Sequence, residues 1–119
     1  GIVVSDSGNS ILRLIRLQGD GCVSEFGGNG WLKPRGVCTY QGGLLVCDTG
    51  HHRIRSLTVS GEGARVFAGC GIKGFSDGRC DSAKFNSPSA VCVLEDGSVV
   101  VADTGNNAIR VIQGGVVST

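Results

Sequence analysis

The sequence has little proline, few aromatic residues and no long apolar segment. Only two of its 119 residues are proline, and phenylalanine, tryptophan and tyrosine together make up 5%. No run approaches the roughly 18 apolar residues of a membrane span, and the first residues do not read as a signal peptide. We therefore expect no membrane association. The scarcity of aromatic rings also disfavours a surface that stacks single-stranded RNA bases.

The chain also lacks a strong excess of either charge. Its net charge is +1 and 40% of its residues are hydrophobic, which argues against disorder and against a general nucleic-acid binder. Residues 1–76 hold eight lysines or arginines against five acids, whereas residues 77–119 hold three against five. This modest excess of positive charge in residues 1–76 leaves RNA binding as an alternative function.

Glycine, in contrast, is abundant. The 21 glycines follow no collagen period, so they indicate many tight turns. A single domain that turns so often is predicted to be all-β, with short strands.

One ten-residue pattern occurs three times, at residues 4–13, 46–55 and 101–110. In each copy an aspartate is followed by a hydroxyl residue and a glycine, and an arginine lies seven positions after the aspartate. The repeated residues are Asp6, Gly8 and Arg13, then Asp48, Gly50 and Arg55, then Asp103, Gly105 and Arg110.

These repeated residues are interpreted as structural. The aspartate is expected to accept backbone N–H groups of the residues that follow it, with the hydroxyl as a second local acceptor. The glycine is expected to supply a positive φ. The arginine stem is expected to pack between sheets while its head finds an aspartate or carbonyl groups, the alternative being a ligand-facing role.

The repeat spacing predicts a β-propeller. The aspartates are 42 and 55 residues apart, and the first interval suits a four-stranded blade. Eleven strands are predicted, at residues 2–5, 11–17, 22–26, 36–40, 44–48, 54–59, 64–67, 90–94, 98–103, 108–112 and 116–119. They give a partial blade (residues 1–30), a blade (31–69), an inter-blade insertion (70–87) and a further blade (88–119). Residues 77–81 lack the ligand pattern of a calcium loop and are read as a turn.

At these residues the chain resembles the NHL-repeat family of β-propellers. The match runs through Pro34-Arg35-Gly36-Val37 with residues 46–54, and through Pro88-Ser89-Ala90-Val91 with residues 101–109. The namesake Asn-His-Leu triplet keeps its histidine only at His52. Residues 68–78 and 83–88 look like the long-loop version of the repeat. The resemblance covers essentially the whole chain and implies an arc of two complete blades plus three strands of another.

An arc of this size is too small to close. Closed propellers have about four to eight blades, and an arc leaves apolar blade faces uncovered. We therefore expect either that the chain is part of a longer propeller or that two arcs of about three blades associate into a six-bladed ring.

The six cysteines are interpreted mainly as small buried residues. Cys47 occupies the slot of Ala102, Cys22 that of Ala64, and Cys38 and Cys92 share one slot. A Cys70–Cys80 disulfide is the alternative for the two thiols in the insertion. No C-x-x-C spacing supports a metal site, and free thiols favour a reducing, intracellular location.

The favoured function is a non-catalytic scaffold that binds a protein or peptide through rim loops. The candidate contact residues are His51, His52, Lys73, Phe75 and Arg79, with Phe85 in the same insertion. For His51 and His52 themselves a structural turn role is the favoured interpretation, since the family consensus has histidine at the position of His52.

The alternatives are an RNA-binding propeller and a lyase or lactonase of the kind found in resembling families. The predicted innermost strands, residues 36–40 and 90–94, contain no aspartate, glutamate or histidine to hold a catalytic metal. We therefore expect no enzyme activity, catalytic residue or cofactor in these blades, although ligands for a metal could lie in other blades.

Overall fold

The computed structural model describes residues 1–19 and 21–119, which form short strands joined by tight turns. Three 3₁₀ turns, η1 (Ser7–Asn9), η2 (Thr49–His51) and η3 (Thr104–Asn106), join consecutive strands. None of the described residues lies in a helix that could cross a membrane. The strands are β1 (Ile2–Asp6), β2 (Ile11–Ile15), β3 (Val23–Phe26), β4 (Val37–Tyr40), β5 (Gly43–Asp48), β6 (Arg53–Thr58), β7 (Arg65–Ala68), β8 (Gly78–Arg79), β9 (Pro88–Val93), β10 (Val99–Asp103), β11 (Ala108–Gln113) and β12 (Val116–Ser118).

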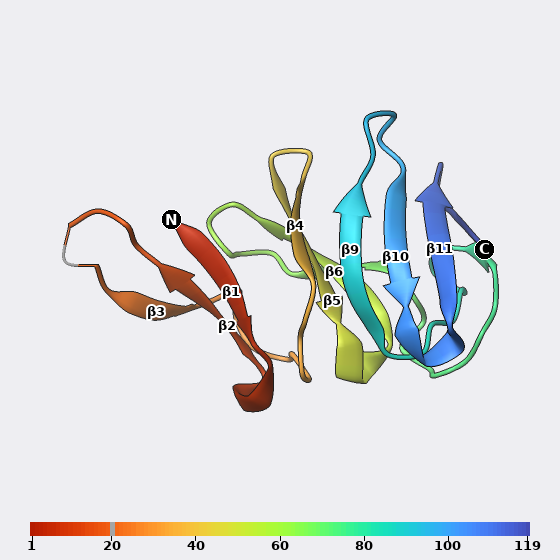
Figure 1. The fold of residues 1–119 in the computed structure, drawn as a ribbon, viewed down its shortest axis with the longest axis horizontal. Helices are drawn as coiled ribbons and strands as arrows, with labels where there is room; N and C mark the ends of the chain where they lie inside the picture. The colour runs from red at the N-terminus through yellow and green to blue at the C-terminus, as the bar shows by residue number, and fades with distance from the viewer. Residues whose placement is uncertain (20) are drawn as a thin grey trace.

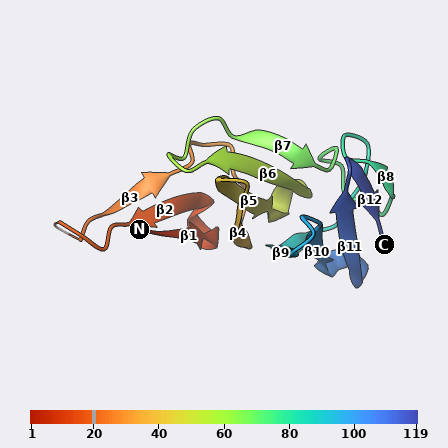
Figure 2. The same cartoon turned by 90° about the horizontal axis from the view of Figure 1, so that it is seen from above.

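The strands form three antiparallel sheets, which are the blades of a propeller arc. Their strand orders are β1-β2-β3, β4-β5-β6-β7 and β9-β10-β11-β12-β8. Figures 1 and 2 show the sheets standing side by side, with β1, β4 and β9 along the inner side of the arc and β3, β7 and β8 along its outer side. We call these sheets blades 1, 2 and 3. The predicted all-β propeller arc is confirmed.

All eleven predicted strands are present, and their bounds differ from the predicted ones by no more than two residues. The twelfth strand, β8, was missed. Gly78 and Arg79 pair with Val117 and Val116, so the insertion adds a fifth strand to blade 3. The interpretation of residues 77–81 as a turn is therefore wrong for Gly78 and Arg79, which form a strand. The local sequence could not indicate this strand, because its pairing partner lies almost forty residues further along the chain.

The insertion also contributes to the core, which the sequence analysis did not anticipate. Ala83 and Phe85 have no exposed surface, so the expectation that Phe85 is available to a partner is wrong. Burying a phenylalanine ring is worth about 2 kcal/mol or more. The insertion therefore stabilises blade 3.

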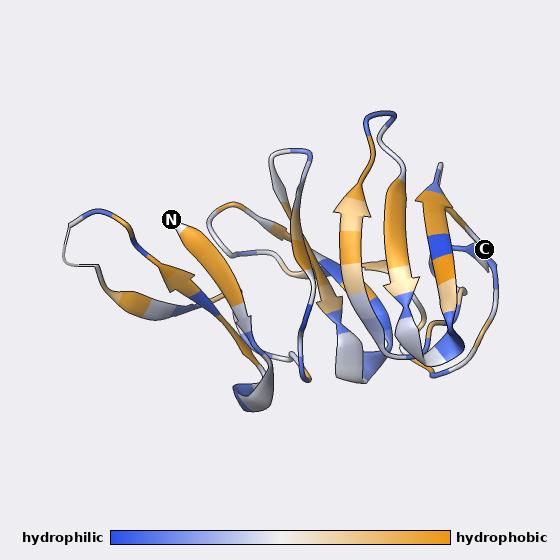
Figure 3. Ribbon diagram, viewed as in Figure 1, coloured by the Kyte–Doolittle hydropathy of each residue, from blue (hydrophilic) through white to orange (hydrophobic). Residues whose placement is uncertain are grey.

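The core lies between blades rather than within one sheet. Between blades 1 and 2 it contains Leu12, Phe26, Trp31, Val46 and Leu57. Between blades 2 and 3 a larger cluster joins Leu45 and Ile54 to Phe85, Val99 and Val101, with further members from both sheets. Figure 3 shows how apolar residues follow the strands while the turns are polar. Each blade therefore depends on its neighbour for its apolar face.

The cysteine predictions are confirmed only in part. Cys70 and Cys80 are not bonded to each other, so the alternative of a Cys70–Cys80 disulfide is wrong. Cys47 is buried and Cys38 is half-buried, but Cys22 and Cys92 are exposed, and for these two the predicted burial is wrong. Cys92 lies on the face of blade 3 opposite its buried neighbour Val91, because successive strand residues point to opposite faces.

Both ends of the arc present apolar surface. Ile2 on blade 1 is 47% exposed and Ile109 on blade 3 is 58% exposed. Ile109 lies on the face opposite Arg110 and Ile112, whose side chains are buried toward blade 2. These faces suit a further blade or a second copy, and the expected ring closure by association stays a prediction.

Candidate functional site

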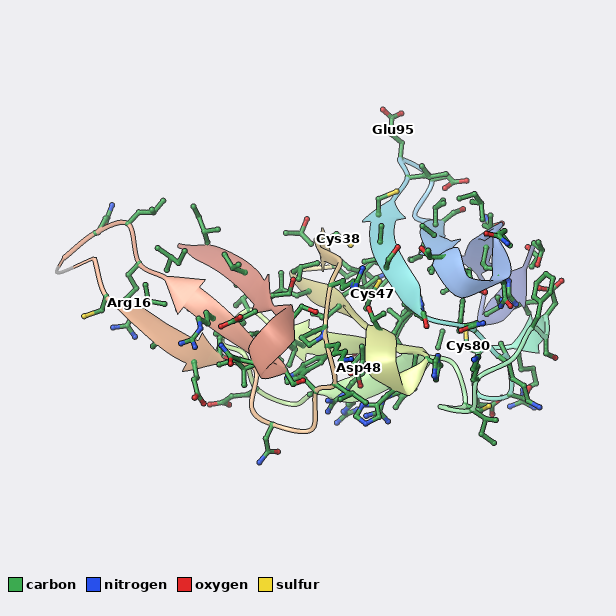
Figure 4. All side chains as sticks on the ribbon, turned by 60° about the horizontal axis from the view of Figure 1, so that its bottom comes forward. Arg16, Cys38, Cys47, Asp48, Cys80 and Glu95 are labelled. Atoms are coloured by element: carbon green, nitrogen blue, oxygen red, sulfur yellow. The ribbon has the colours of Figure 1, made fainter. Side chains whose placement is uncertain are left out.

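The three repeated turns lie on one rim of the arc. We call this edge the turn rim; it consists of η1, η2, η3, the two linkers that enter blades 2 and 3 (residues 31–35 and 85–89), and residues 70–75 of the insertion, where the carbonyl of Gly74 accepts a hydrogen bond from Asn106 of η3 at 2.9 Å. It forms the lower edge in Figure 1. Figure 4 shows Asp48 on the turn rim and Glu95 on the opposite rim, at the tip of the β9–β10 hairpin.

The repeated glycine is required for close approach rather than for a positive φ. Gly50 and Gly105 do not adopt positive φ, so this part of the sequence interpretation is wrong. A Cβ at Gly50 would lie 2.8 Å from the carbonyl oxygen of Leu32, and one at Gly105 would lie 2.6 Å from that of Asn86. Gly50 donates its N–H to the carbonyl of Leu32, and Gly105 donates its N–H to that of Asn86, each at 2.8 Å. The turn therefore rests directly on the linker.

The left-handed conformation occurs two residues after each glycine. Ser10, His52 and Asn107 have φ values of 55°, 55° and 52° and end the 3₁₀ turns. Two of these side chains also accept backbone hydrogen bonds from the next linker. Ser10 Oγ accepts from the N–H of Lys33 at 3.1 Å, and His52 Nδ1 accepts from that of Ser87 at 3.0 Å. The turns η1 and η2 thus each hold the entrance of the following blade.

In copies 2 and 3 the repeated aspartate accepts a backbone N–H from the linker and not from the backbone of its own turn. Asp48 Oδ1 accepts from the N–H of Leu32 at 2.9 Å, and Asp103 Oδ1 accepts from that of Asn86 at 2.8 Å. None of the three aspartates caps its 3₁₀ turn. The predicted Asx-type turn is therefore wrong, because the linker N–H groups reach the carboxylate from a remote part of the chain.

The second carboxylate oxygen binds side chains at conserved offsets within the repeat in copies 1 and 3. Asp6 Oδ2 accepts from Asn9 at 2.9 Å and from Arg13 at 2.8 Å. Asp103 Oδ2 accepts from Asn106 and from Arg110, both at 2.7 Å. Asn9 and Arg13 together hold the pKa of Asp6 below its ordinary value.

Copy 2 replaces both partners of the aspartate. Asp48 Oδ2 lies 2.9 Å from His51 Nδ1 and 2.9 Å from Arg53 Nε. The repeated Arg55 instead donates to the carbonyl of Gly30 at 3.4 Å and lies 4.3 Å from the centroid of the Trp31 ring. Copy 2 differs from the others in having an arginine, Arg53, five residues after the aspartate. Copies 1 and 3 have the apolar residues Ile11 and Ala108 at this position.

Arg55 and Arg110 share a second role that sequence reasoning missed. Arg110 lies 4.9 Å from the centroid of Phe85, and Phe85 occupies the linker position equivalent to Trp31, three residues before the proline. Such cation–π contacts contribute about 1–2 kcal/mol when they are shielded from water. The sequence signal for this contact was the aromatic residue three positions before each proline, Trp31 before Pro34 and Phe85 before Pro88.

Arg110 anchors the insertion to blade 3. Its guanidinium donates to the carbonyls of Lys84 and Ser76 at 2.9 and 2.8 Å, and to Asp77 Oδ1 at 2.9 Å. Phe75 covers it, with the ring centroid 4.8 Å from Arg110 Cζ. A hydrogen bond from Thr119, followed by the contact with Arg110, lowers the pKa of Asp77. The insertion is therefore a fixed structure on the rim.

The candidate contact residues are only partly brought together. The insertion starts beside the histidine turn, since a Cβ at Gly69 would lie 3.0 Å from the carbonyl of His52. Lys73 is exposed on the insertion and Phe75 is 57% exposed. His51 and His52 are half-exposed and engaged with Asp48 and Ser87. Arg79 lies instead on the outer edge strand β8, paired with Asp81 at 3.4 Å.

The arrangement offers no ready-made metal centre within residues 1–19 and 21–119, where no group of three metal-ligating side chains occurs. The innermost strands β4 and β9 hold no carboxylate or imidazole. The expectation that these blades have no enzyme activity stays a prediction.

Comparisons with known proteins agree with this architecture. A family model described as NHL repeat matches residues 85–112. The chain is 32% identical over 92% of its length to Protein SUPPRESSOR OF QUENCHING 1, chloroplastic, of Arabidopsis thaliana, and covers 12% of that protein. It is 41% identical over 58% of its length to NHL repeat-containing protein 2 of Gallus gallus, and covers 9% of it. Human teneurin-4 is 38% identical over 63% of the chain, which covers 3% of it.

A crystal structure of a Bacteroides thetaiotaomicron protein of unknown function matches the whole chain with a TM-score of 0.73 and 22% identity, and this chain covers 34% of it. That likeness concerns the fold alone. The chain thus spans a small part of the curated relatives and about a third of the solved structure. Residues 85–112 thus match the NHL repeat, and the relatives and the blade architecture agree with this likeness to NHL-repeat β-propellers.

Proposed function

We propose that this chain is a non-catalytic binding module that holds a protein or peptide partner on its turn rim. The observation that carries the proposal is the insertion, which is fixed by buried Arg110 and nevertheless exposes apolar side chains. Ile72 is 62% exposed and Phe75 is 57% exposed, and Lys73 lies between them. Apolar anchors on a rigid support suit protein recognition, because little conformational freedom is lost on binding.

The division of the repeat into constant and variable positions supports the same proposal. In copies 2 and 3 the aspartate and the glycine hold the turn against its linker, whereas the neighbouring positions differ between copies. His51 and His52 in copy 2 stand where copy 3 has Asn106 and Asn107. A scaffold that fixes the backbone and varies its rim side chains is the arrangement expected of a recognition surface.

The RNA and enzyme alternatives receive less support from the side chains. Trp31 and Phe85 are buried beneath arginines, and Tyr40 packs on Phe67 with ring centroids 5.3 Å apart. Phe75 is the one strongly exposed ring among the described residues, and Arg110 occupies one of its faces. Single-stranded RNA binding usually needs several free rings.

Site-specific photo-crosslinking tests the proposal. A photoreactive amino acid at Ile72 probes the turn rim, and the same residue at Glu95 probes the opposite rim of the same protein. In cells, we expect discrete protein adducts at position 72 and few at position 95. Equal adducts at both positions, or adducts at position 95 alone, would contradict binding at the turn rim.

A further inference from the structure

A groove crosses the turn rim where blade 2 meets blade 3. It has a volume of about 420 Å³ and is lined by Lys33 and Arg35 on the blade 2 linker and by Ser87, Ser89 and Thr104 of blade 3. We call it the linker groove. Its size is in the range of small-ligand sites, and its lining contains no carboxylate and no aromatic ring.

The linker groove concentrates unneutralised positive charge. Lys33 and Arg35 are both exposed, and neither forms an ion pair with any part of the chain that the structure describes. A guanidinium and an ammonium group beside one cavity favour an oxyanion, since charge-assisted hydrogen bonds to oxyanions are about twice as strong as neutral ones.

The backbones that carry these cations are held in place. The N–H of Lys33 donates to Ser10 Oγ at 3.1 Å, while Arg35 donates its N–H to the carbonyl of Cys47 at 3.0 Å. Arg35 also accepts a hydrogen bond from Ser5 Oγ at 2.5 Å. Only the flexible side chains therefore have to order when a ligand binds.

The opposite wall supplies a hydroxyl donor. Ser89 Oγ and Thr104 Oγ1 are hydrogen-bonded to each other. Because one hydroxyl donates to the other in this pair, the second O–H remains able to donate to a ligand.

The fold does not require the two cations. Lys33 and Arg35 flank Pro34 just as Ser87 and Ser89 flank Pro88 in the next repeat. The two linkers share their conformation, with φ of 48° at Lys33 and 53° at Ser87. Serine at both positions is therefore compatible with this backbone, so the linker conformation does not depend on the positive charge.

We propose that the linker groove binds a phosphomonoester on a serine or threonine of the partner peptide. Two cations match the charge of about −1.5 to −2 on such a group, and the hydroxyl supplies a further donor. The lack of an aromatic ring in the lining favours a phosphopeptide over a nucleic acid, whose bases would have no stacking surface. This inference rests on the proposed function and adds the chemistry that the partner presents.

The test compares three short peptides, Gly-Ala-Xaa-Ala-Gly, in which Xaa is phosphoserine, glutamate or serine. Binding is followed by the NMR shifts of the amides of Ser87, Ser89 and Thr104, up to about 10 mM peptide, where a millimolar site is nearly saturated. We expect saturable binding of the phosphoserine peptide, weaker binding of the glutamate peptide and none of the serine peptide.

The decisive variant is Lys33→Ser with Arg35→Ser, which copies the next repeat. It should keep the melting temperature of the wild type and lower the affinity for the phosphoserine peptide about tenfold or more. The matched control, Arg16→Ser with Arg65→Ser, removes the same charge from exposed positions outside the groove and should change affinity less than about twofold. Arg16 lies on blade 1, remote from the groove (Figure 4).

Three outcomes would overturn the proposal: no saturable shift with the phosphoserine peptide, equal binding of the phosphoserine and serine peptides, or unchanged affinity in the Lys33→Ser/Arg35→Ser variant. Tighter binding of a single-stranded RNA oligonucleotide that this variant abolishes would also overturn it and assign the groove to RNA. Crosslinking at Ile72 separates the two proposals, because it would persist if only the groove assignment failed.

Discussion

Asp103 and Arg110 form an ion pair with no exposed surface: Arg110 Nη1 lies 2.7 Å from Asp103 Oδ2, and both side chains are completely buried. The same pair in copy 1, Asp6 and Arg13, lies at the surface, with 31% and 36% of the side chains exposed. The same aspartate–arginine pair is therefore buried in copy 3 and exposed in copy 1. Its contribution to the stability of the protein should differ between the two copies.

Replacing Arg110 with methionine should destabilise the protein by about 3–5 kcal/mol, because it leaves the carboxylate of Asp103 buried without its charged partner. Arg13→Met is the matched control and should cost no more than about 1 kcal/mol, since exposed ion pairs contribute little. Urea unfolding of both variants measures the difference. A similar small loss in both would show that burial does not govern the pair.

Alanine at Gly105 should destabilise the protein by about 1–3 kcal/mol, because its Cβ would press on the carbonyl of Asn86, which is backbone and cannot rotate away. Gly8→Ala is the control at the equivalent position, where no atom lies within 4 Å of the added Cβ. Gly8→Ala should be neutral or slightly stabilising. Thermal unfolding compares the two, and equal effects would contradict the close-approach explanation.

Burial, followed by the proximity of Cys38, raises the pKa of the Cys47 thiol to about 12. The unfolded thiol ionises near pH 8.5, so the stability contributed by the neutral buried thiol is complete below that pH and declines as the pH rises toward 12. At pH 10 the wild type should have lost about 1–2 kcal/mol more than Cys47→Ala, relative to pH 7.5.

Urea unfolding at pH 7.5 and 10 measures this loss, and alanine is a suitable replacement because Ala102 occupies the same slot in copy 3. The control is Cys70→Ala, which removes an exposed thiol and should leave the pH dependence of the wild type unchanged. A Cys47→Ala variant that loses as much stability as the wild type would contradict the role of Cys47.

His52→Ala should weaken the connection between blades 2 and 3, because it removes the acceptor for the N–H of Ser87 and places alanine at a φ of 55°. The expected loss is about 1–2 kcal/mol. His52→Asn copies Asn107 of the next repeat, tolerates this conformation and should retain most of the stability. Hydrogen exchange at the Ser87 amide is the readout, and slow exchange in His52→Ala would count against the contact.

The strands and turns of this protein could be predicted from the sequence because their determinants are local. Alternating apolar residues define each strand, and the Asp-hydroxyl-Gly pattern recurs at the same place in every blade. The repeat also indicated the blade architecture, since its spacing is that of one four-stranded unit.

The partners of the turn residues could not be predicted in the same way. The sequence places Asp48 seven residues before Arg55, but the structure pairs Asp48 with Arg53 and directs Arg55 onto Trp31. Both arginines are within reach along the chain, and the choice depends on a ring delivered by the preceding linker. The glycine requirement likewise came from a backbone carbonyl at Leu32, eighteen residues earlier.

The sequence by itself determined the repeat, the strand order and the residues that form each turn, because neighbouring residues interact through short, fixed geometry. Only the tertiary structure decided which side chains share an environment: β8 paired with β12, Phe85 beneath Arg110, and Lys33 and Arg35 facing the serines of the next linker. These groupings arise when one blade packs against the next and brings together segments that are remote in sequence. The candidate site on the turn rim therefore belongs to the assembly of blades and not to any single repeat.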